Sequence, residues 1–225
     1  MNFLFNAASL NKLGFVGGLN EYPTILQFNF KRIKGNLVHK TSIINWDKVI
    51  IGKGNILGPN VIVGTDAQHP YEKSSGKIFI SNNNVFREFT TIHLPTKIKK
   101  KTVIGDNCYF MTLSHIAHDC NVEDGVIFSN NVTLGGNTHV MKKSQLGFNT
   151  TVHQNQVIGS YAMIGMSSVI TKKIKIMPGY LYAGNPAKKI SINKVGIKKK
   201  KISKDDLKKE EKRFNSIIKK HPLYC

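Results

Sequence analysis

The chain is poor in acidic residues, cysteine and tryptophan, and each shortage narrows what it can be. Its 225 residues include 13 acidic against 33 lysine and arginine side chains, which gives a formal net charge of +20. The three cysteines, Cys108, Cys120 and Cys225, lack the spacing of a metal site or of a disulfide framework. Small buried cysteines of this kind are typical of a reducing compartment. We therefore predict no metal site at these cysteines.

Long apolar runs are also absent. No stretch approaches the roughly 20 apolar residues that span a membrane, and Met1–Ala8 lacks the basic start of a signal peptide. We expect a cytoplasmic protein without a membrane span. The positive charge makes nucleic acid a partner to consider, but the lysines are scattered apart from Lys97–Lys101, Lys198–Lys201 and the C-terminal tail. We expect no nucleic acid, since an acidic protein partner or a phosphorylated substrate explains the charge.

What the chain does have is a period of six. Every sixth residue from Ile80 to Ile176 is hydrophobic, a spacing that neither an α-helix nor an isolated strand produces. It is typical of a hexapeptide β-helix, in which each short strand points one large side chain inward before the chain turns a corner. Upstream, five further apolar residues stand in the same phase and are predicted to point inward: Val38, Ile44, Ile50, Ile56 and Ile62. A polar loop at 65–77 interrupts the series, and we expect the phase to survive it.

A second series supports the repeat. Four residues after each apolar position the chain carries a small or β-branched residue, as tight packing on a pleated surface requires. The members are Thr90, Thr96, Thr102, Cys108, Ser114, Cys120, Val126, Val132, Thr138, Ser144 and Thr150. Glycines follow directly after several apolar positions, for example Gly135 and Gly147, where backbones are expected to approach closely.

The repeat divides the chain into three parts. Residues 1–37 lack it and are predicted to cap the open end of the coil, because a β-helix would otherwise expose unpaired strand edges. Residues 38–187 form the β-helix, of about seven coils, with its loop at 65–77. Residues 188–225 form a basic linker, expected to be irregular over 188–202, and an amphipathic helix begun by the capping-box variant at Ser203–Asp206. The fold class is all-β with a short C-terminal α-helical extension.

Stacking of coils brings distant residues together. Hexapeptide β-helices as a class place 18 residues in one coil, so residues 18 apart lie at the spacing of neighbouring strands. Gly136 then lies above His118, and Gln154 above Gly136, while Asn137 lies above Asp119. His153 adjoins Gln154. We predict that one corner of the coil gathers these six residues.

These side chains are the parts of an acyl-transfer site. A neutral histidine takes a proton from a hydroxyl or amine nucleophile, a neighbouring carboxylate orients its ring, and a glycine N–H donates to the developing oxyanion. His118, Asp119 and Gly136 fit these roles. Metal binding by His115 and His118 is disfavoured, because no further ligand stands at a suitable position.

Four segments carry a resemblance to a known family: residues 86–93, 115–120, 129–136 and 152–154. They resemble the UDP-N-acetylglucosamine acyltransferases, the first enzymes of lipid A biosynthesis, over about residues 38–202. The resemblance implies a left-handed parallel β-helix and a homotrimer with active sites between subunits. It also implies that an acyl group passes from acyl carrier protein to a hydroxyl of a nucleotide-sugar acceptor, with no cofactor.

The resemblance also implies residue roles. His118 is the expected general base, Asp119 assists it, and Gly136 supplies the oxyanion N–H. Asn137 replaces a family histidine, and the acceptor loop of the family corresponds to Gln68 and His69, where His69 replaces a carboxylate. The remaining expected substrate-binding residues are His115, His153, Gln154, Asn193, Lys199 and Lys200.

Two other readings remain open at this stage. Gly184–Lys188, of sequence GNPAK, is common after the last coil of sugar or nucleotide-sugar acetyltransferases that use acetyl-CoA as the donor. The alternative donor is therefore an acyl-CoA. The third reading is a β-helix that serves as a scaffold without catalysis.

Overall fold

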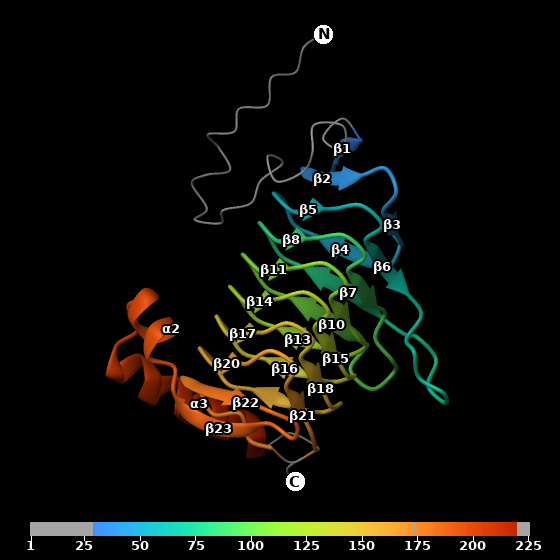
Figure 1. Ribbon diagram of the computed structural model, residues 1–225. Coiled ribbons are helices and arrows are strands. Elements are labelled where there is room, and N and C mark those ends of the chain that lie inside the picture. Colours follow the sequence, from blue (N-terminus) through green and yellow to red (C-terminus); the bar gives the residue numbers. More distant parts are fainter. Residues whose placement is uncertain (1–28, 173, 220–225) are drawn as a thin grey trace.

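The computed structural model describes residues 29–172 and 174–219 of the chain, and these form a left-handed parallel β-helix with helices at its C-terminal end (Figure 1). The predicted fold class is confirmed. Short strands wind around a common axis and stack into three sheets, here named A, B and C. The chain passes from sheet A to B to C in each coil, so three corners, A–B, B–C and C–A, run along the helix.

Parallel pairing dominates all three sheets. Sheet A has ten strands: β1 (Phe30–Ile33), β2 (Asn36–His39), β5 (Ile56–Leu57), β8 (Val85–Phe86), β11 (Tyr109–Phe110), β14 (Ile127–Phe128), β17 (Gln145–Leu146), β20 (Met163–Ile164), β22 (Tyr180–Ala183) and β23 (Lys188–Ile192). Sheet B has seven: β3 (Ile43–Ile44), β6 (Ile62–Thr65), β9 (Thr91–His93), β12 (His115–Ile116), β15 (Thr133–Leu134), β18 (Thr151–Val152) and β21 (Val169–Ile170). Sheet C has six: β4 (Val49–Ile51), β7 (Lys77–Ile80), β10 (Lys101–Ile104), β13 (Asn121–Val122), β16 (His139–Val140) and β19 (Val157–Ile158).

The 18-residue step holds over the coils from β11 to the C-terminal end of the β-helix, and a residue is called above another here when it lies one coil closer to that end. Ile116 of β12 pairs with Leu134 of β15, which pairs with Val152 of β18, and all three side chains point into the core. Inside sheet A, Phe110 meets Phe128 of the next coil edge to face, and Phe86 stacks on Phe110 across a longer step of 24 residues. Every member of the small-residue series from Thr90 to Thr150 is buried, in keeping with the tight packing predicted for these positions. A Cβ on Gly135 would lie 2.5 Å from the backbone nitrogen of Gln154, which explains the glycine at that corner.

Ile98 is an exception to the predicted inward series. Its side chain is 69% exposed, because residues 95–100 leave the coil as a six-residue excursion. The pairing shows this directly, since His115 of β12 pairs with Thr91 of β9, 24 positions earlier, instead of 18. Spacing alone could not reveal the excursion, as an excursion of six residues preserves the phase of the repeat.

The predicted phase is also wrong by one residue over three upstream positions. The inward residues are Ile51, Leu57 and Val63, which pair in line with Ile80, Phe86 and Ile92, whereas Ile50 is 48% exposed. Ile51 comes seven positions after Ile44 instead of six, so the turn between them holds one extra residue. The loop before β7 restores the phase. The sequence hides the shift because each of these strands carries two adjacent large apolar residues: Ile50–Ile51, Ile56–Leu57 and Ile62–Val63.

Both ends of the coil carry antiparallel strands. β1 pairs with β2 across the first coil, while the rest of the predicted N-terminal cap, residues 1–28, lies outside the described residues. At the other end β23 pairs antiparallel with β22, and α2 (Lys194–Lys199) follows. The expectation of an irregular segment at 188–202 was therefore wrong, since β23 extends sheet A and α2 is capped by Asn193.

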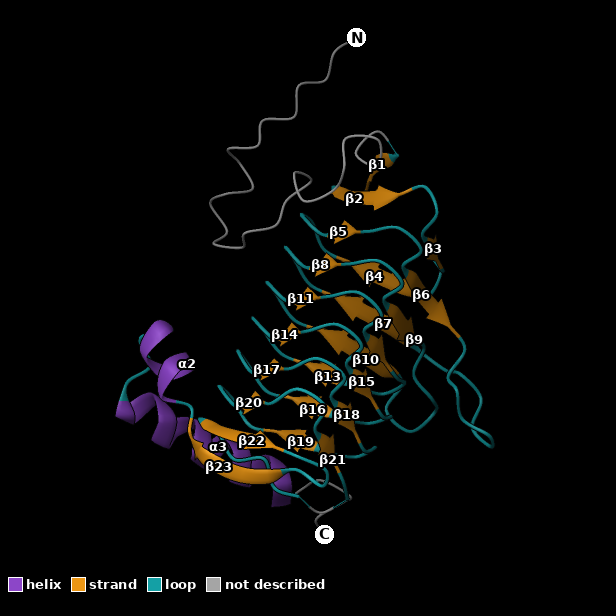
Figure 2. Cartoon of the chain, viewed as in Figure 1, coloured by secondary structure: helices purple, strands orange, loops and turns teal. Residues whose placement is uncertain are grey.

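The C-terminal helix α3 (Lys204–Lys219) begins at the predicted capping box. The Ser203 hydroxyl accepts from the Asp206 N–H at 3.0 Å, and the Asp206 carboxylate accepts from the Ser203 N–H at 3.0 Å. The helix packs on its own coil (Figure 2), with Phe214 buried against Met141 and Val157 of the C side. No helix among the described residues is long and apolar enough to cross a membrane.

Candidate active site

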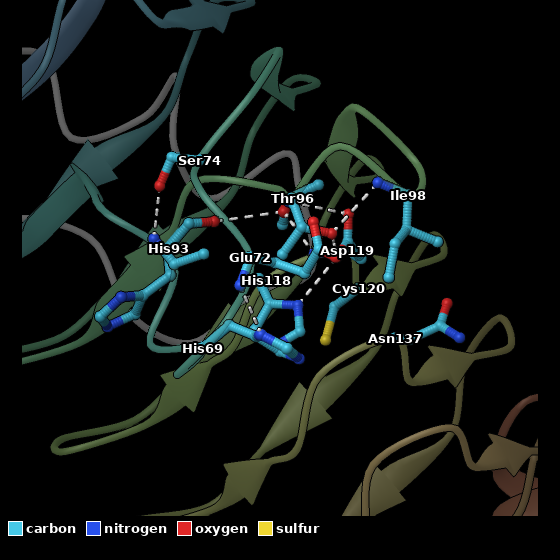
Figure 3. A network of polar contacts seen from close by, with 12 residues as sticks. His69, Glu72, Ser74, His93, Thr96, Ile98, His118, Asp119, Cys120 and Asn137 are labelled. Carbon is cyan, nitrogen blue, oxygen red and sulfur yellow. Dashed lines mark hydrogen bonds and ion pairs between the residues drawn. The ribbon is translucent and has the colours of Figure 1, made fainter.

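His118 and Asp119 lie in the turn between β12 and β13, at the B–C corner. Both loops that leave the coil do so at this same corner, one between β6 and β7 and the other between β9 and β10. Ser75 donates its N–H to the Pro95 carbonyl at 2.8 Å, so the two loops are joined. They place His69 and Thr96 beside the two residues of the turn (Figure 3).

His118 and Asp119 form a buried hydrogen-bonded pair. The His118 Nδ1 donates to the Asp119 Oδ2 at 2.8 Å, and the two residues are 8% and 1% exposed. Since Nδ1 holds a proton for this bond, the lone pair of the neutral ring lies on Nε2. The pair therefore presents an oriented imidazole base next to a fixed carboxylate.

Thr96 holds the other side of the Asp119 carboxylate. Its hydroxyl donates to Oδ2 at 2.7 Å and its N–H donates to Oδ1 at 3.1 Å. Burial acts to raise the pKa of Asp119, but the hydrogen bonds from His118 and Thr96 outweigh it, and the pKa lies below its usual value. Sequence reasoning placed Thr96 in the small-residue series and missed this contact, because the contact depends on the excursion at residues 95–100.

Gly136 lies directly above His118, as the 18-residue step predicted. A Cβ on Gly136 would sit 2.4 Å from the His118 Cε1 and 2.5 Å from Nε2, so only glycine leaves room for the ring. The Asn137 N–H donates to the His118 carbonyl at 2.8 Å, which ties the two coils together. The Gly136 N–H donates to no group within the described part of the chain. It is therefore free to stabilise an oxyanion beside the imidazole.

The loop between β6 and β7 supplies a second ring. His69 meets His118 edge to face, with ring centroids 5.4 Å apart. Its Nδ1 accepts from the Glu72 N–H at 3.0 Å, so the proton of the neutral His69 ring lies on Nε2. Gln68 precedes it on the same loop and is exposed. His69 therefore forms a wall of the site, whereas Gln68 faces solvent.

His115 lies on β12, just before the turn. It shares a 2.8 Å hydrogen bond with Thr91 through Nδ1, and its ring packs edge to face on His93 with centroids 5.0 Å apart. Burial, followed by the nearby His93 and His118, lowers the pKa of His115 to about 4. His115 is therefore neutral near pH 7 and lines the site without adding charge.

The remaining stacked residues lie further from the pair. His153 and Gln154 are exposed, one coil beyond Gly136, and His153 donates through Nδ1 to the Gln154 carbonyl at 2.8 Å. Asn137 donates from Nδ2 to Asn155 at 2.6 Å, and its carboxamide points away from the His118 ring in Figure 3. Its buried Oδ1 has no hydrogen-bond partner among the described residues. The geometry is a column of polar groups above the His118–Asp119 pair.

Asn193, Lys199 and Lys200 do not join this group within one chain. The Asn193 Nδ2 donates to the Tyr161 carbonyl and the Lys200 Nζ donates to the Lys143 carbonyl, and both carbonyls belong to turns at the C–A corner. Burial, together with Lys143, lowers the pKa of Lys200 to about 8. Asn193 and Lys200 therefore lie at the C–A corner, with Lys199 next to Lys200 on α2, and His118 lies at the B–C corner.

Metal binding finds no support in the arrangement of acidic, histidine and cysteine side chains. No group of three such side chains within residues 29–172 and 174–219 could hold a metal ion. Cys108 and Cys120 are buried free thiols, and burial raises the pKa of each to about 12. The chemistry available at this corner is therefore that of a base, a carboxylate and a backbone N–H.

A family model, a curated protein and two solved structures give consistent matches to this chain. Residues 101–136 match the family model described as bacterial transferase hexapeptide (six repeats). The acyl-[acyl-carrier-protein]–UDP-N-acetylglucosamine O-acyltransferase of Synechocystis sp. is 31% identical over 175 residues, which are 77% of this chain and 63% of that protein. The chain thus spans about 63% of the length of this curated relative.

Solved structures show the same relationship. The UDP-N-acetylglucosamine acyltransferase from Campylobacter jejuni is 30% identical, with a TM-score of 0.63, and the match covers 84% of this chain and 78% of that one. A UDP-N-acetylglucosamine acyltransferase from Bacteroides fragilis is 26% identical with a TM-score of 0.72, and the match covers 81% of this chain and 71% of that one.

Proposed function

The chain belongs to the UDP-N-acetylglucosamine acyltransferase family of hexapeptide-repeat proteins, and we propose that it transfers an acyl group from an acyl carrier protein thioester to a hydroxyl of UDP-N-acetylglucosamine. This is the reaction that the name of the Synechocystis relative describes. It would place the protein at the start of lipid A biosynthesis, as the resemblance in sequence implies.

One observation carries the proposal: the His118 ring is fixed by Asp119 on one side and lies against Gly136 on the other. Its Nε2 accepts the proton of the acceptor hydroxyl while the hydroxyl oxygen attacks the thioester carbonyl. The negative charge on the carbonyl oxygen is stabilised by the Gly136 N–H. The intermediate then expels the thiolate, which takes the proton back from His118, and an ester and a free carrier thiol remain. His118, Asp119 and Gly136 are the catalytic residues in this scheme.

The charge around the site supports a carrier protein as the donor. Lys97, Lys99 and Lys100 follow Thr96 on the excursion that touches Asp119, and Lys101 begins β10. Among the described residues none of these four lysines forms an ion pair. A concentration of unpaired positive charge beside the base suits an acidic donor protein and the phosphate of its prosthetic arm. An acyl-CoA, which also carries phosphates, is the competing donor.

The acceptor site and the assembly belong to the same proposal. Asn193, Lys199 and Lys200 lie at the C–A corner, where lysines suit a diphosphate as point charges. A homotrimer would bring the C–A corner of one subunit to the B–C corner of the next, so that these residues join His118 at one acceptor site. His115, His153, Gln154 and Gln68 then line the substrate path. The buried free thiols Cys108 and Cys120 favour a reducing compartment, and we place the reaction in the cytoplasm.

A donor comparison tests the proposal. Purified protein is offered UDP-N-acetylglucosamine with either a 3-hydroxyacyl carrier protein thioester or acetyl-CoA, and the acylated nucleotide sugar is measured by mass spectrometry. Turnover with the carrier thioester is expected, and His118→Ala should lower it by about 10²–10⁴-fold. Turnover with acetyl-CoA alone would support the acetyltransferase reading. Absence of turnover with every donor, from folded trimeric protein, would favour the scaffold reading.

A further inference from the structure

Thr96 occupies a place that the regular coil cannot supply. A regular step of 18 residues would put residue 101 next to Asp119 in the preceding coil. That coil is six residues longer, because it contains the excursion at residues 95–100. The result is that Thr96 reaches Asp119 from the coil below, with its hydroxyl on Oδ2 and its N–H on Oδ1. The excursion thus delivers two hydrogen-bond donors to the one carboxylate that touches His118.

We propose that Thr96 is a positioning residue for the acyl transfer, which acts on His118 through Asp119. The proposal rests on the proposed function and extends it to a residue outside the base, carboxylate and oxyanion donor. Oδ2 accepts from both the Thr96 hydroxyl and the His118 Nδ1, at 2.7 and 2.8 Å, while Oδ1 accepts from the Thr96 N–H. Three donors on two oxygens fix both the rotation of the carboxylate and the direction from which the imidazole N–H approaches it.

The arrangement also sets how strongly Asp119 attracts the proton of His118. The Thr96 hydroxyl shares Oδ2 with the imidazole, so it draws off part of the negative charge that would otherwise stabilise the imidazolium. Lys99 faces Asp119, and His115 and His69 face His118, but none of the three changes in a Thr96 variant. Loss of the hydroxyl should therefore raise the pKa of His118 and loosen the ring at once. A residue that only stabilised the loop would produce neither effect on His118.

Thr96 also connects the site to the second loop. Ser74 of the loop between β6 and β7 forms an antiparallel bridge with Thr96, and its hydroxyl accepts from the Ala67 N–H at 2.7 Å. The same loop carries His69, whose ring meets His118. One threonine therefore lies at the junction of both loops and the carboxylate, which explains why its side chain is buried although the excursion around it is exposed.

The test uses Thr96→Val, which keeps the shape and removes the donor, and Thr96→Ser, which keeps the donor. Thr96→Ala is made in parallel, so that the hydroxyl is tested even where valine does not fold. Thr150→Val is the matched control, because Thr150 is a buried threonine whose hydroxyl donates to the Gly147 carbonyl, away from the pair. For each full-length protein, kcat, KM, the pH profile of kcat and the melting temperature are measured.

Thr96→Val and Thr96→Ala should lower kcat by about 10- to 100-fold, because the carboxylate that orients the base loses a hydrogen bond to a charged group, with KM for both substrates within about two-fold. The acidic limb of the pH profile should move up by about half a pH unit or more. Thr96→Ser should restore both values, and Thr150→Val should change neither. The proposal would be overturned if the pH profile stayed unchanged and kcat fell only in proportion to the fraction of unfolded protein. It would also be overturned if Thr96→Ser lowered kcat as much as Thr96→Val.

A second measurement separates this proposal from the proposed function. The protein is labelled at the Cε1 of histidine, and the His118 resonance, identified by its loss in His118→Gln, is titrated by NMR without substrate. A higher pKa of His118 in Thr96→Val than in the wild type supports the coupling even where no donor is turned over. Equal pKa values of His118 in the two proteins overturn it, whatever the activity.

Discussion

The rings of His69 and His118 meet edge to face, at 83° and with centroids 5.4 Å apart, although the residues lie 49 positions apart in the chain. His69 reaches this place because its loop leaves the coil at the same corner as the turn that carries His118. The His69 Nδ1 accepts a hydrogen bond from the Glu72 N–H. The ring therefore forms one wall of the site, with Nε2–H as its free donor.

Loss of the His69 ring should weaken catalysis without unfolding the protein. His69→Ala is expected to lower kcat/KM for the nucleotide sugar by about 3- to 10-fold, the range of one aromatic contact. Water then enters beside His118, and the nucleotide sugar loses the His69 Nε2–H as a hydrogen-bond donor. Steady-state kinetics with varied acceptor measures this effect. Tyr71→Ala is the control, since Tyr71 packs on His69 but is 91% exposed. Equal losses in both variants would show that the loop as a whole, and not His69, matters.

Gly136 gives a test of the contact between the oxyanion donor and the base. Its backbone adopts an ordinary φ, so alanine meets no backbone strain, but the added Cβ collides with the His118 ring. Gly136→Ala should lower kcat by about 10²–10³-fold, because the backbone N–H stays while the displaced imidazole no longer serves as the base, and a general base contributes about 10²–10⁴-fold. Circular dichroism should show that the coil stays folded.

The double variant makes that interpretation specific. In a His118→Ala background the collision is gone, so adding Gly136→Ala should cost little further activity, a clear departure from additivity. Independent, multiplicative losses would contradict the idea that the alanine acts by displacing the imidazole.

The sequence was most informative where the repeat is regular. Steps of 18 placed Gly136 above His118 correctly, because four coils in succession have neither insertion nor deletion between Phe110 and Ile176. They failed for Ile98, since an apolar residue at the right spacing looks the same whether it points inward or lies on an excursion. They failed again at Ile50 and Ile51, where two adjacent isoleucines make the inward residue ambiguous.

The contacts made by the loops were beyond prediction from spacing. Thr96 and His69 reach the site through the path of two irregular loops, which depends on the bridge between Ser74 and Thr96 and on the Pro95 carbonyl. His69 was identified only through the family resemblance. The small-residue series predicted tight packing at Thr96, but periodicity contains no information about which polar group a buried hydroxyl binds.

The lysines of the excursion should act on the encounter with the donor protein. Lys97→Glu with Lys100→Glu is expected to raise KM for the carrier protein thioester several-fold while kcat stays nearly constant, because exposed charges at a docking surface act mainly on association. The difference from wild type should shrink as salt rises from 50 to 500 mM, since the Debye length falls from roughly 14 to 4 Å.

Two comparisons isolate the docking effect. A simple acyl-pantetheine thioester carries no protein, so its KM should be the same in the variant and the wild type. Lys208→Glu with Lys212→Glu, on the exposed part of α3, makes the same change in net charge elsewhere and should leave KM for the carrier thioester unchanged. A similar rise in KM for that thioester from the helix variant would mean that only the overall charge matters.

His115 should make the fold sensitive to mild acid. Burial, with His93 and His118 nearby, lowers its pKa to about 4, against about 6.5 in an unfolded chain. Between these two values the unfolded chain binds the proton and the folded one does not, so the free energy of unfolding decreases as the pH falls from 6.5 towards 4. By pH 4.5 this single group should cost roughly 2 kcal/mol. His39, whose pKa burial also lowers, adds a smaller effect of the same sign.

Thermal unfolding followed by circular dichroism between pH 7.5 and 4.5 measures this dependence. His115→Gln keeps a polar partner for Thr91 but does not titrate, so its melting temperature should fall less over this range than that of the wild type. His153→Gln is the matched control, because His153 is exposed and its replacement should leave the slope of melting temperature against pH unchanged. A His115→Gln protein with the full acid sensitivity of the wild type would show that other groups cause it, and that His115 is protonated at little cost in the folded state.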